Sequence, residues 1–292
     1  MRETLLLILA VAVGAQAFCY RKSPPRSQDT AESLAQPGNY SIWVCVQSQD
    51  LAADLEKAPK ANTTQLWVSM SHVPKLPADA FAKLADKLVK IEIWSSKLAE
   101  IDDAALNGLK ELKGLILPRN ELSTIKAAWF KHTQKLLELN LANNKIASIE
   151  IDFLKSLPAL INLDLRGNEL LALPEDFVKQ LPPTLRRLNI FNNPLNYRQT
   201  NQLAEYSKTK DDKTNEPRLK ELKHVLSVTK SCLDDKDLSD KSNAGVDKCV
   251  EERMTKALML IASGQVPVSG STTSPGTTST TVAGASSTTA KP

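Results

Sequence analysis

The feature that most constrains this chain is an eleven-residue pattern that recurs at intervals of 24 or 25 residues. The third copy reads LKGLILPRNEL, with apolar residues at the first, fourth, sixth and eleventh positions and Asn at the ninth. The six copies occupy residues 63–73, 88–98, 112–122, 136–146, 160–170 and 185–195. Repeats of this length predict a solenoid, in which each unit buries its apolar edge only against its neighbours.

The pattern also assigns roles to positions within a unit. The apolar fourth and sixth residues predict a short strand that directs both of them inward and the residue between them outward. Apolar residues recur in the second half of each unit, at Leu76, Ile101, Ile125, Ile149 and Leu173, and again at Phe81, Leu106, Phe130, Leu154 and Val178. The polar ninth residue is expected to bond buried backbone groups of adjacent coils. It is Ser71, Ser96, Asn120, Asn144, Asn168 and Asn193 in the six units.

Over residues 43–197 these units resemble extracellular leucine-rich repeat (LRR) proteins. The resemblance implies an α/β fold: a right-handed solenoid with a parallel concave sheet and an N-terminal disulfide cap. After Asn193-Pro194 the chain departs from the Cys-rich C-terminal cap that is usual in this family, because no Cys follows nearby, and the residues themselves predict a helical C-terminal cap instead. The resemblance also implies a protein that binds an extracellular protein or a glycoconjugate. The overall plan is similar to secreted insect leucine-rich immune proteins, which implies a role in innate immunity. The alternative is a structural component of an extracellular matrix or surface coat.

The ligand is expected to bind the outward side of the strands, which forms the concave face of such a solenoid. The predicted contact residues are Trp67, Trp94, Ile116, Glu138, Asn140, Asp164, Arg166, Arg187 and Phe191. The first three make an apolar N-terminal half, whereas the charged residues make a polar C-terminal half. Aromatic and Arg side chains commonly anchor protein interfaces. The alternative is that the N-terminal cap or a glycan shields the two Trp. Trp129 falls on the convex half of its unit and is expected in the core.

The first seventeen residues have the form of a signal peptide. Arg2 precedes an apolar run, and Ala15-Gln16-Ala17 fits a signal-peptidase site. The run is too short to span a bilayer, and no second stretch of sufficient length follows it. The mature chain is therefore expected to begin near Phe18 and to be secreted.

Two further features fit export. Asn39 and Asn62 each begin a glycosylation sequon. Residues 263–292 include fifteen Ser or Thr, and such a segment cannot bury enough apolar area to fold. We expect a disordered Ser/Thr-rich tail, either O-glycosylated or unmodified.

Four cysteines allow three disulfide pairings. The pairs Cys19–Cys45 and Cys232–Cys249 are favoured, because each closes a local loop. The first lies in the expected N-terminal cap (18–62), which precedes the six repeats (63–197), and the second lies in the expected C-terminal cap.

The expected C-terminal cap is segment 198–262, where periodic apolar residues predict two helices joined by a loop over 234–244. The alternative is that residues 199–262 join two chains in a homo- or hetero-dimer.

Composition argues against other functions. A formal net charge of +4 over 292 residues does not mark a nucleic-acid-binding protein. The three His are far apart and lack ligand spacing, so we expect no metal and no cofactor. No Ser/His/Asp set or phosphate-binding Gly loop is present, and we therefore expect no enzymatic activity.

Overall fold

The computed structural model describes residues 18–22, 41–210 and 215–262. The predicted signal peptide, Asn39 and the Ser/Thr-rich tail lie outside these residues. The chain forms two compact units, one up to Val250 and one from Glu251 onward, and each is described by itself.

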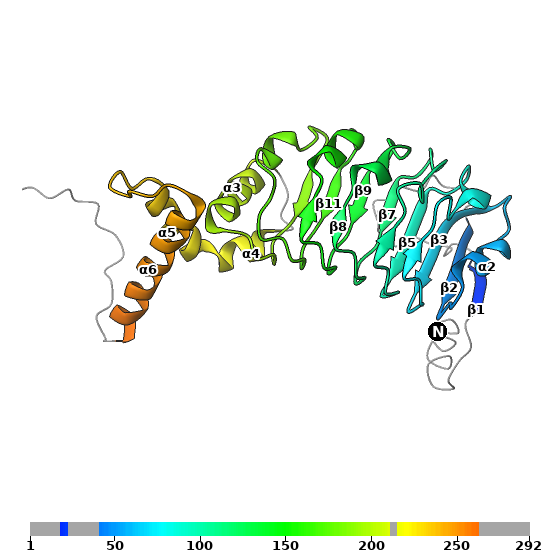
Figure 1. Cartoon of the computed structure of the whole chain (residues 1–292), viewed down its shortest axis with the longest axis horizontal. Helices are drawn as coiled ribbons and strands as arrows, with labels where there is room; N and C mark the ends of the chain where they lie inside the picture. Colours follow the sequence, from blue (N-terminus) through cyan, green and yellow to red (C-terminus); the bar gives the residue numbers. More distant parts are fainter. Residues whose placement is uncertain (1–17, 23–40, 211–214, 263–292) are drawn as a thin grey trace, which may run out of the picture. The chain divides into compact units, whose positions relative to one another are not determined.

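One eight-stranded sheet runs through the first unit, in the order β1-β2-β3-β5-β7-β9-β11-β12 (Figure 1). The strands are β1 (Phe18–Lys22), β2 (Ser41–Val46), β3 (Thr63–Ser69), β5 (Lys90–Trp94), β7 (Gly114–Ile116), β9 (Glu138–Asn140), β11 (Asn162–Asp164) and β12 (Arg187–Asn189). The last six come from the six repeats, and each pairs in parallel with its neighbours. Strand β1 pairs antiparallel with β2 and ends the sheet. The sheet confirms the predicted parallel solenoid.

The other side of each coil consists of short elements. Four 3-10 helices occur there, η1 (Ala82–Leu84), η2 (Ala127–Phe130), η3 (Ile151–Ser156) and η4 (Phe177–Gln180). Two small parallel ladders accompany them, β4 (Lys75–Leu76) with β6 (Glu100–Ile101) and β8 (Thr124–Ile125) with β10 (Ser148–Ile149). Each coil thus has a strand on one side and short 3-10 helices or two-residue strands on the other. The sheet of strands forms the concave side of the solenoid.

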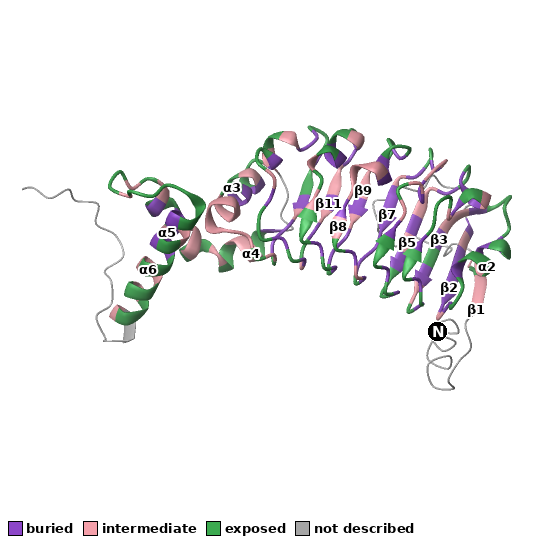
Figure 2. Cartoon of the chain, in the orientation of Figure 1, coloured by how far each residue is buried: buried purple, intermediate pink, exposed green. Residues whose placement is uncertain are grey.

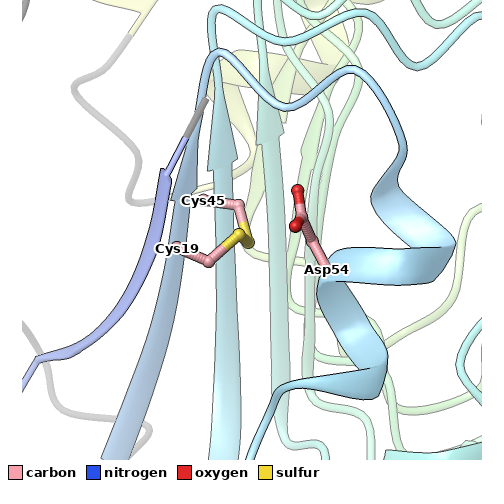
Figure 3. A group of neighbouring side chains, drawn as sticks. All are labelled: Cys19, Cys45 and Asp54. Atoms are coloured by element: carbon pink, nitrogen blue, oxygen red, sulfur yellow. A yellow bond between two sulfur atoms is a disulfide. The ribbon is translucent and has the colours of Figure 1, made fainter. Parts of the chain in front are cut away.

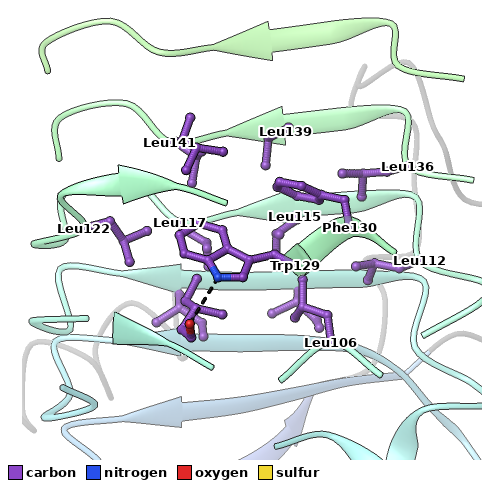
Figure 4. Close-up of a cluster of buried hydrophobic side chains, with 14 of the residues drawn as sticks. Leu106, Leu112, Leu115, Leu117, Leu122, Trp129, Phe130, Leu136, Leu139 and Leu141 are labelled. Carbon is purple, nitrogen blue, oxygen red and sulfur yellow. Dashed lines mark hydrogen bonds between the residues drawn. The ribbon is translucent and has the colours of Figure 1, made fainter. Parts of the chain in front are cut away.

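The core lies between these two sides and follows the repeat pattern (Figures 2 and 4). Phe130 and Phe153 from successive coils are buried with ring centroids 5.8 Å apart. Trp129 is also buried, as predicted, and its indole N–H donates to the Ile101 carbonyl at 3.1 Å. The indole thus enters the core with its one polar atom satisfied.

The expected polar ladder is present. The Asn144 amide donates to the carbonyls of Leu117 and Leu141 at 2.9 and 3.0 Å, and its oxygen accepts from the Leu122 N–H at 3.1 Å. Asn120, Asn168 and Asn193 make equivalent bonds in their coils. In the first coil the Ser71 hydroxyl accepts from the Ser48 N–H at 2.9 Å, which continues the ladder into the cap.

The N-terminal cap consists of β1, β2 and the short helix α2 (Leu51–Glu56), whose N-cap residue Asp50 accepts from the Ala53 N–H. The structure has both favoured disulfides, Cys19–Cys45 and Cys232–Cys249. The first joins β1 to β2, and the second joins α5 (Lys223–Leu233) to α6 (Asn243–Ala262).

The C-terminal segment contains four helices among the described residues, not the predicted two. Helices α3 (Tyr197–Lys208) and α4 (Glu216–Glu221) precede α5 and α6. Asn196 caps α3 by accepting from the Gln199 N–H at 2.9 Å, and Pro217 lies in the first turn of α4. Proline is favoured at a helix start and disfavoured inside, so α4 begins as a separate helix.

Helix α3 closes the last coil by imitating another one. The Gln199 side chain accepts from the Leu173 N–H at 3.0 Å and donates to the Leu173 carbonyl at 2.8 Å, as the backbone of a further coil would. Leu203 of α3 is buried in the core cluster. These contacts confirm a helical C-terminal cap.

The second unit contains the end of α6. Leu258 and Met259 are 63% and 67% exposed there. Over residues 251–260 the residues of α6 are exposed or half-buried (Figure 2). Dimerisation through residues 199–262 stays a prediction. Within the described residues, no helix combines the length and the apolar character needed to cross a membrane.

Candidate binding surface

The strand register arranges the outward side chains of the sheet in three rows. The central row contains Tyr20, Val44, Trp67, Glu92, Ile116, Asn140, Asp164 and Asn189. The row on one side contains Lys22, Ile42, Gln65, Lys90, Gly114, Glu138, Asn162 and Arg187. The row on the other side contains Phe18, Val46, Ser69 and Trp94, followed by Pro118, Ala142, Arg166 and Phe191 at the strand ends. We call these three rows the concave face.

The N-terminal part of the concave face carries a group of aromatic side chains. Trp67 is 37% exposed and Trp94 is 36% exposed, as expected for contact residues. Phe18 and Tyr20 on β1 are half-buried and stack with ring centroids 5.7 Å apart. We call Phe18, Tyr20, Trp67 and Trp94 the aromatic strip. The Lys22 ammonium lies 5.9 Å from the centroid of the Trp67 ring, within cation–π range.

The repeat pattern does not predict the contribution of β1 to the concave face, because β1 precedes the first repeat. The sequence does contain a sign of this strand. Phe18, Tyr20 and Lys22 occur at every second position, which in a strand places all three side chains on the same face. The antiparallel pairing with β2 places all three in the rows of the concave face.

A chain of contacts along β5 fixes the Trp94 ring. The Trp94 indole N–H donates to one Glu92 carboxylate oxygen at 3.0 Å, and the other oxygen lies 2.8 Å from the Lys90 ammonium. The Lys90 stem lies across Gly114 on the next strand, where an added Cβ would be 3.0 Å from the Lys90 Cγ. Gly114 therefore leaves the space that Lys90 occupies.

Two predicted contact residues are not available to a ligand. Ile116 is only 4% exposed, between Glu92 and Asn140 in the central row. Phe191 is 5% exposed and belongs to the core cluster. The expectation that both are exposed is wrong. Sequence position assigns a side chain to a face, but neighbouring side chains and the cap decide how much of it remains in contact with water.

The remaining predicted residues form a polar group around β9, β11 and β12. Arg166 and Arg187 are exposed, and Glu138 is half-buried. Asn140 and Asp164 each accept from the backbone N–H two residues later, at 3.0 and 3.1 Å, so their side chains also shape the strand ends.

Asp164 is half-buried beside Arg166, whose Nε lies 3.3 Å from its carboxylate. Burial raises the pKa of Asp164, although the backbone bond and the charge of Arg166 oppose the change. The structure therefore places a partly desolvated carboxylate in the middle of the polar half.

The disulfide of the N-terminal cap lies beneath β1 (Figure 3). Cys19, Cys45 and Asp54 have ligand atoms within 4.8 Å of one another, but both sulfurs are joined in the disulfide and are not thiolates. Burial disfavours ionisation of Asp54, but hydrogen bonds from Lys57 and Ser48 outweigh it and lower the Asp54 pKa. These three residues therefore have a structural role, namely to hold β1 and α2 in place.

The sequon residue Asn62 is exposed directly before β3. A glycan there would start at the margin of the concave face, three positions from Gln65. Whether it carries one stays a prediction.

Comparisons with known proteins agree with this architecture. The leucine rich repeat family model matches residues 86–146. Opticin from Canis lupus familiaris is 37% identical over 90 residues, which cover 30% of this chain and 27% of that protein. Opticin from Bos taurus is 35% identical over 98 residues, which cover 30% of each protein. The chain thus matches less than a third of the length of these relatives.

Two solved structures show a similar arrangement over about half of the chain. The TLR13–ssRNA13 complex is similar with a TM-score of 0.46 and 25% identity, over 52% of this chain and 21% of that one. The Toll–Spatzle complex of Drosophila is similar with a TM-score of 0.42 and 22% identity, over 46% of this chain and 19% of that one. The family model over residues 86–146, the six coils and the Asn ladder together show that this chain contains a leucine-rich repeat solenoid.

Proposed function

We propose that this protein is secreted and recognises another extracellular protein through its concave face, with Trp67 and Trp94 as anchors. The observation that carries the proposal is the exposure of these two large aromatic residues on adjacent strands of an open sheet. Trp is enriched among the residues that dominate binding energy at protein interfaces. The two disulfides fit an oxidising compartment such as the extracellular space.

The dimensions of the face favour a macromolecular ligand. Strands lie about 4.8 Å apart, so the distance from β1 to β11 across the sheet is roughly 30 Å. A small molecule would contact only part of this surface. A protein could contact the aromatic strip and the polar group together, with the apolar residues supplying affinity and the charges supplying orientation.

The anchors are also held in place before binding. Trp94 is fixed by Glu92, and Trp67 lies against Lys22. Side chains that are already ordered lose less conformational entropy when a partner binds. A role in innate immunity is the biological setting that we propose, on the strength of the resemblance to secreted insect immune proteins.

The test uses the full secreted chain as bait in extracellular fluid from its source, with chemical cross-linking. The proposal predicts that the wild type captures a discrete protein and that the double variant Trp67→Ala/Trp94→Ala does not. Leu171→Ala is the matched control, because Leu171 is 70% exposed but lies outside the rows of the concave face. Equal capture by the double variant would contradict the proposal and favour a coat component that assembles through other surfaces.

A further inference from the structure

The aromatic end of the concave face carries an excess of positive charge. Lys22 and Lys90 belong to one row of the face. Lys113 directly precedes β7, and Arg119 follows the end of the same strand. Among the described concave residues of β1, β2, β3, β5 and β7, the acidic side chain is Glu92.

Backbone ladders place Lys113 and Arg119 at the two margins of this area. The Lys113 N–H donates to the Val89 carbonyl at 2.8 Å, so residue 113 lies beside the start of β5. Residue 119 occupies the position next to Ser95, because the Ser95 N–H donates to the Pro118 carbonyl. Arg119 is exposed and Lys113 is half-buried. Both cations therefore flank the strand that carries Trp94.

Glu92 does not offset this charge. Its two oxygens are engaged by the Lys90 ammonium and the Trp94 indole N–H, so the charge of Glu92 is paired with that of Lys90. Glu111, two residues before Lys113, pairs with Lys135 at 2.6 Å and also interacts with the charge of Lys113, so this one carboxylate lies between two Lys side chains. Among the described residues around the aromatic strip, the cations Lys22, Lys90, Lys113 and Arg119 outnumber the carboxylates Glu92 and Glu111.

We infer that the partner segment bound by the aromatic strip is acidic, with aromatic or aliphatic side chains between its carboxylates. The inference rests on the proposed function and specifies the chemistry of its ligand. Apolar side chains would pack on Trp67 and Trp94, while the carboxylates would meet Lys113 and Arg119 at the margins. Complementary charge of this kind raises the association rate and selects among partners.

The acidic residues of the polar half disfavour binding of an acidic segment there, so such a segment is expected at the aromatic end of the concave face. Glu138 and Asp164 belong to the rows there, so carboxylates of a ligand would meet like charges. Arg166 and Arg187 also lie there, which leaves that half mixed in sign. The acidic segment therefore belongs at the aromatic end, where a single engaged carboxylate is present among the described rows.

The test measures binding of the full chain to a random copolymer of Glu and Tyr by titration calorimetry. A Lys–Tyr copolymer and heparin serve as comparison probes. We expect saturable binding of the Glu–Tyr copolymer that weakens severalfold when ionic strength rises from about 0.05 M to about 0.5 M, because exposed charges are screened over shorter distances at high salt. The charge reversal Lys113→Glu/Arg119→Glu is expected to weaken binding at least tenfold or so.

Arg186→Glu is the matched control. Arg186 is exposed and occupies the same repeat position as Lys113, since both precede a strand in the same backbone ladder, but it lies beside β12. Its reversal is expected to change the affinity for the Glu–Tyr copolymer less than about twofold. Circular dichroism checks that each variant is folded.

Three outcomes of the calorimetric titrations would overturn the inference. They are the absence of saturable binding of the Glu–Tyr copolymer, tighter binding of the Lys–Tyr copolymer, and heparin binding of equal strength that is insensitive to Trp67→Ala/Trp94→Ala. The last would assign the positive charge to an anionic glycan. The capture experiment separates the two proposals. If Trp67→Ala/Trp94→Ala no longer captures the protein but Lys113→Glu/Arg119→Glu still does, the proposed function is supported and the inference of an acidic partner is wrong. If both variants still capture the protein, both proposals fail.

Discussion

The Trp94 indole N–H donates to the Glu92 carboxylate at 3.0 Å, and Lys90 holds the other oxygen of that carboxylate at 2.8 Å. The three side chains alternate along β5, so all lie on the concave face. A bond between a surface Trp and a fixed acceptor orders the ring without burying it. The hydrogen bond to Glu92 explains how the Trp94 side chain can be accessible to a partner and still have a fixed orientation.

Glu92→Ala is expected to weaken partner binding by about three- to tenfold, because Trp94 would have to be ordered during association. Glu92→Gln keeps an acceptor for the indole N–H and is expected to retain most of the affinity. Both changes should alter the free energy of unfolding by less than about 1 kcal/mol, since the Lys90–Glu92 pair is partly exposed to water. Calorimetry with the captured partner and thermal melts provide the two readouts. Wild-type affinity in Glu92→Ala would contradict this role.

The Asn ladder is predicted to contribute several kcal/mol to the stability of the solenoid. Asn144→Ala removes three buried hydrogen bonds of 3.1 Å or less and a longer one to the Ala142 carbonyl at 3.4 Å, and it leaves three carbonyls and one N–H without that partner. Each lost buried bond costs roughly 1–2 kcal/mol, so we expect a loss of roughly 3–5 kcal/mol in the free energy of unfolding.

Ser71→Ala is the comparison variant for the ladder. The Ser71 hydroxyl accepts from one buried N–H, that of Ser48, and a loss of about 1–2 kcal/mol is expected. Denaturant titration followed by circular dichroism measures both variants. Equal losses in Asn144→Ala and Ser71→Ala would show that the number of ladder bonds does not set the stability.

The two disulfides are predicted to have different effects on binding. In Cys19→Ser/Cys45→Ser, β1 is held to the sheet by its backbone ladder alone, so Phe18, Tyr20 and Lys22 should leave the aromatic strip more often. We expect at least threefold or so weaker binding of the partner together with a stability loss of about 2–4 kcal/mol.

Cys232→Ser/Cys249→Ser is the control for this effect. That disulfide joins α5 and α6, neither of which contributes to the rows of the concave face. Partner affinity should stay near the wild-type value while stability falls. Native hydrogen exchange of the Phe18–Lys22 amides should rise only in the first variant. Unchanged exchange there would show that the ladder alone holds β1.

Asp54 and Asp164 are predicted to give opposite pH dependences. Hydrogen bonds from Lys57 and Ser48 lower the Asp54 pKa in the folded chain, so its contribution to stability is present above the ordinary value of 3.8 and disappears as pH falls through the lowered value. Asp54→Asn should therefore destabilise the protein at neutral pH, and this difference should vanish on acidification.

Burial raises the Asp164 pKa, so the folded chain binds this proton more tightly than the unfolded chain. Stability from this group falls as pH rises from 3.8 through the raised value, and the penalty persists at neutral pH. Asp164→Asn, which keeps an acceptor for the Arg166 N–H, should stabilise the protein at neutral pH but not below the ordinary value. Denaturant titrations at a series of pH values test both residues. Equal signs for the two variants at neutral pH would contradict the assignment.

Much of the fold could be predicted because the repeat fixes the register of neighbouring strands and determines which side chains point into the core. Six strands and the Asn ladder occur where the pattern places them, since each buried Asn can satisfy its bonds only in that register. The break between α3 and α4 could not be read from apolar periodicity, because Pro217 and the Gln199 contact with Leu173 are local features.

The concave face was predicted less completely than the fold. Trp67 and Trp94 are exposed as expected, but Ile116 and Phe191 are buried. Their exposure depends on tertiary neighbours that no repeat position encodes. Strand β1 lies outside the repeats. Its antiparallel pairing with β2 places Phe18 and Tyr20 in the aromatic strip, and the repeat pattern does not predict that pairing.

Hydroxyl-radical footprinting of the full chain, alone and with its captured partner, tests the central claim most directly, because it reports on side chains. The account predicts that the partner protects Trp67, Trp94 and Tyr20 from oxidation, while Met259 and Leu171 react as they do in the free protein. Unchanged oxidation of Trp67 and Trp94, with protection at Met259 or Leu171, would show that the partner binds elsewhere and would contradict recognition through the concave face.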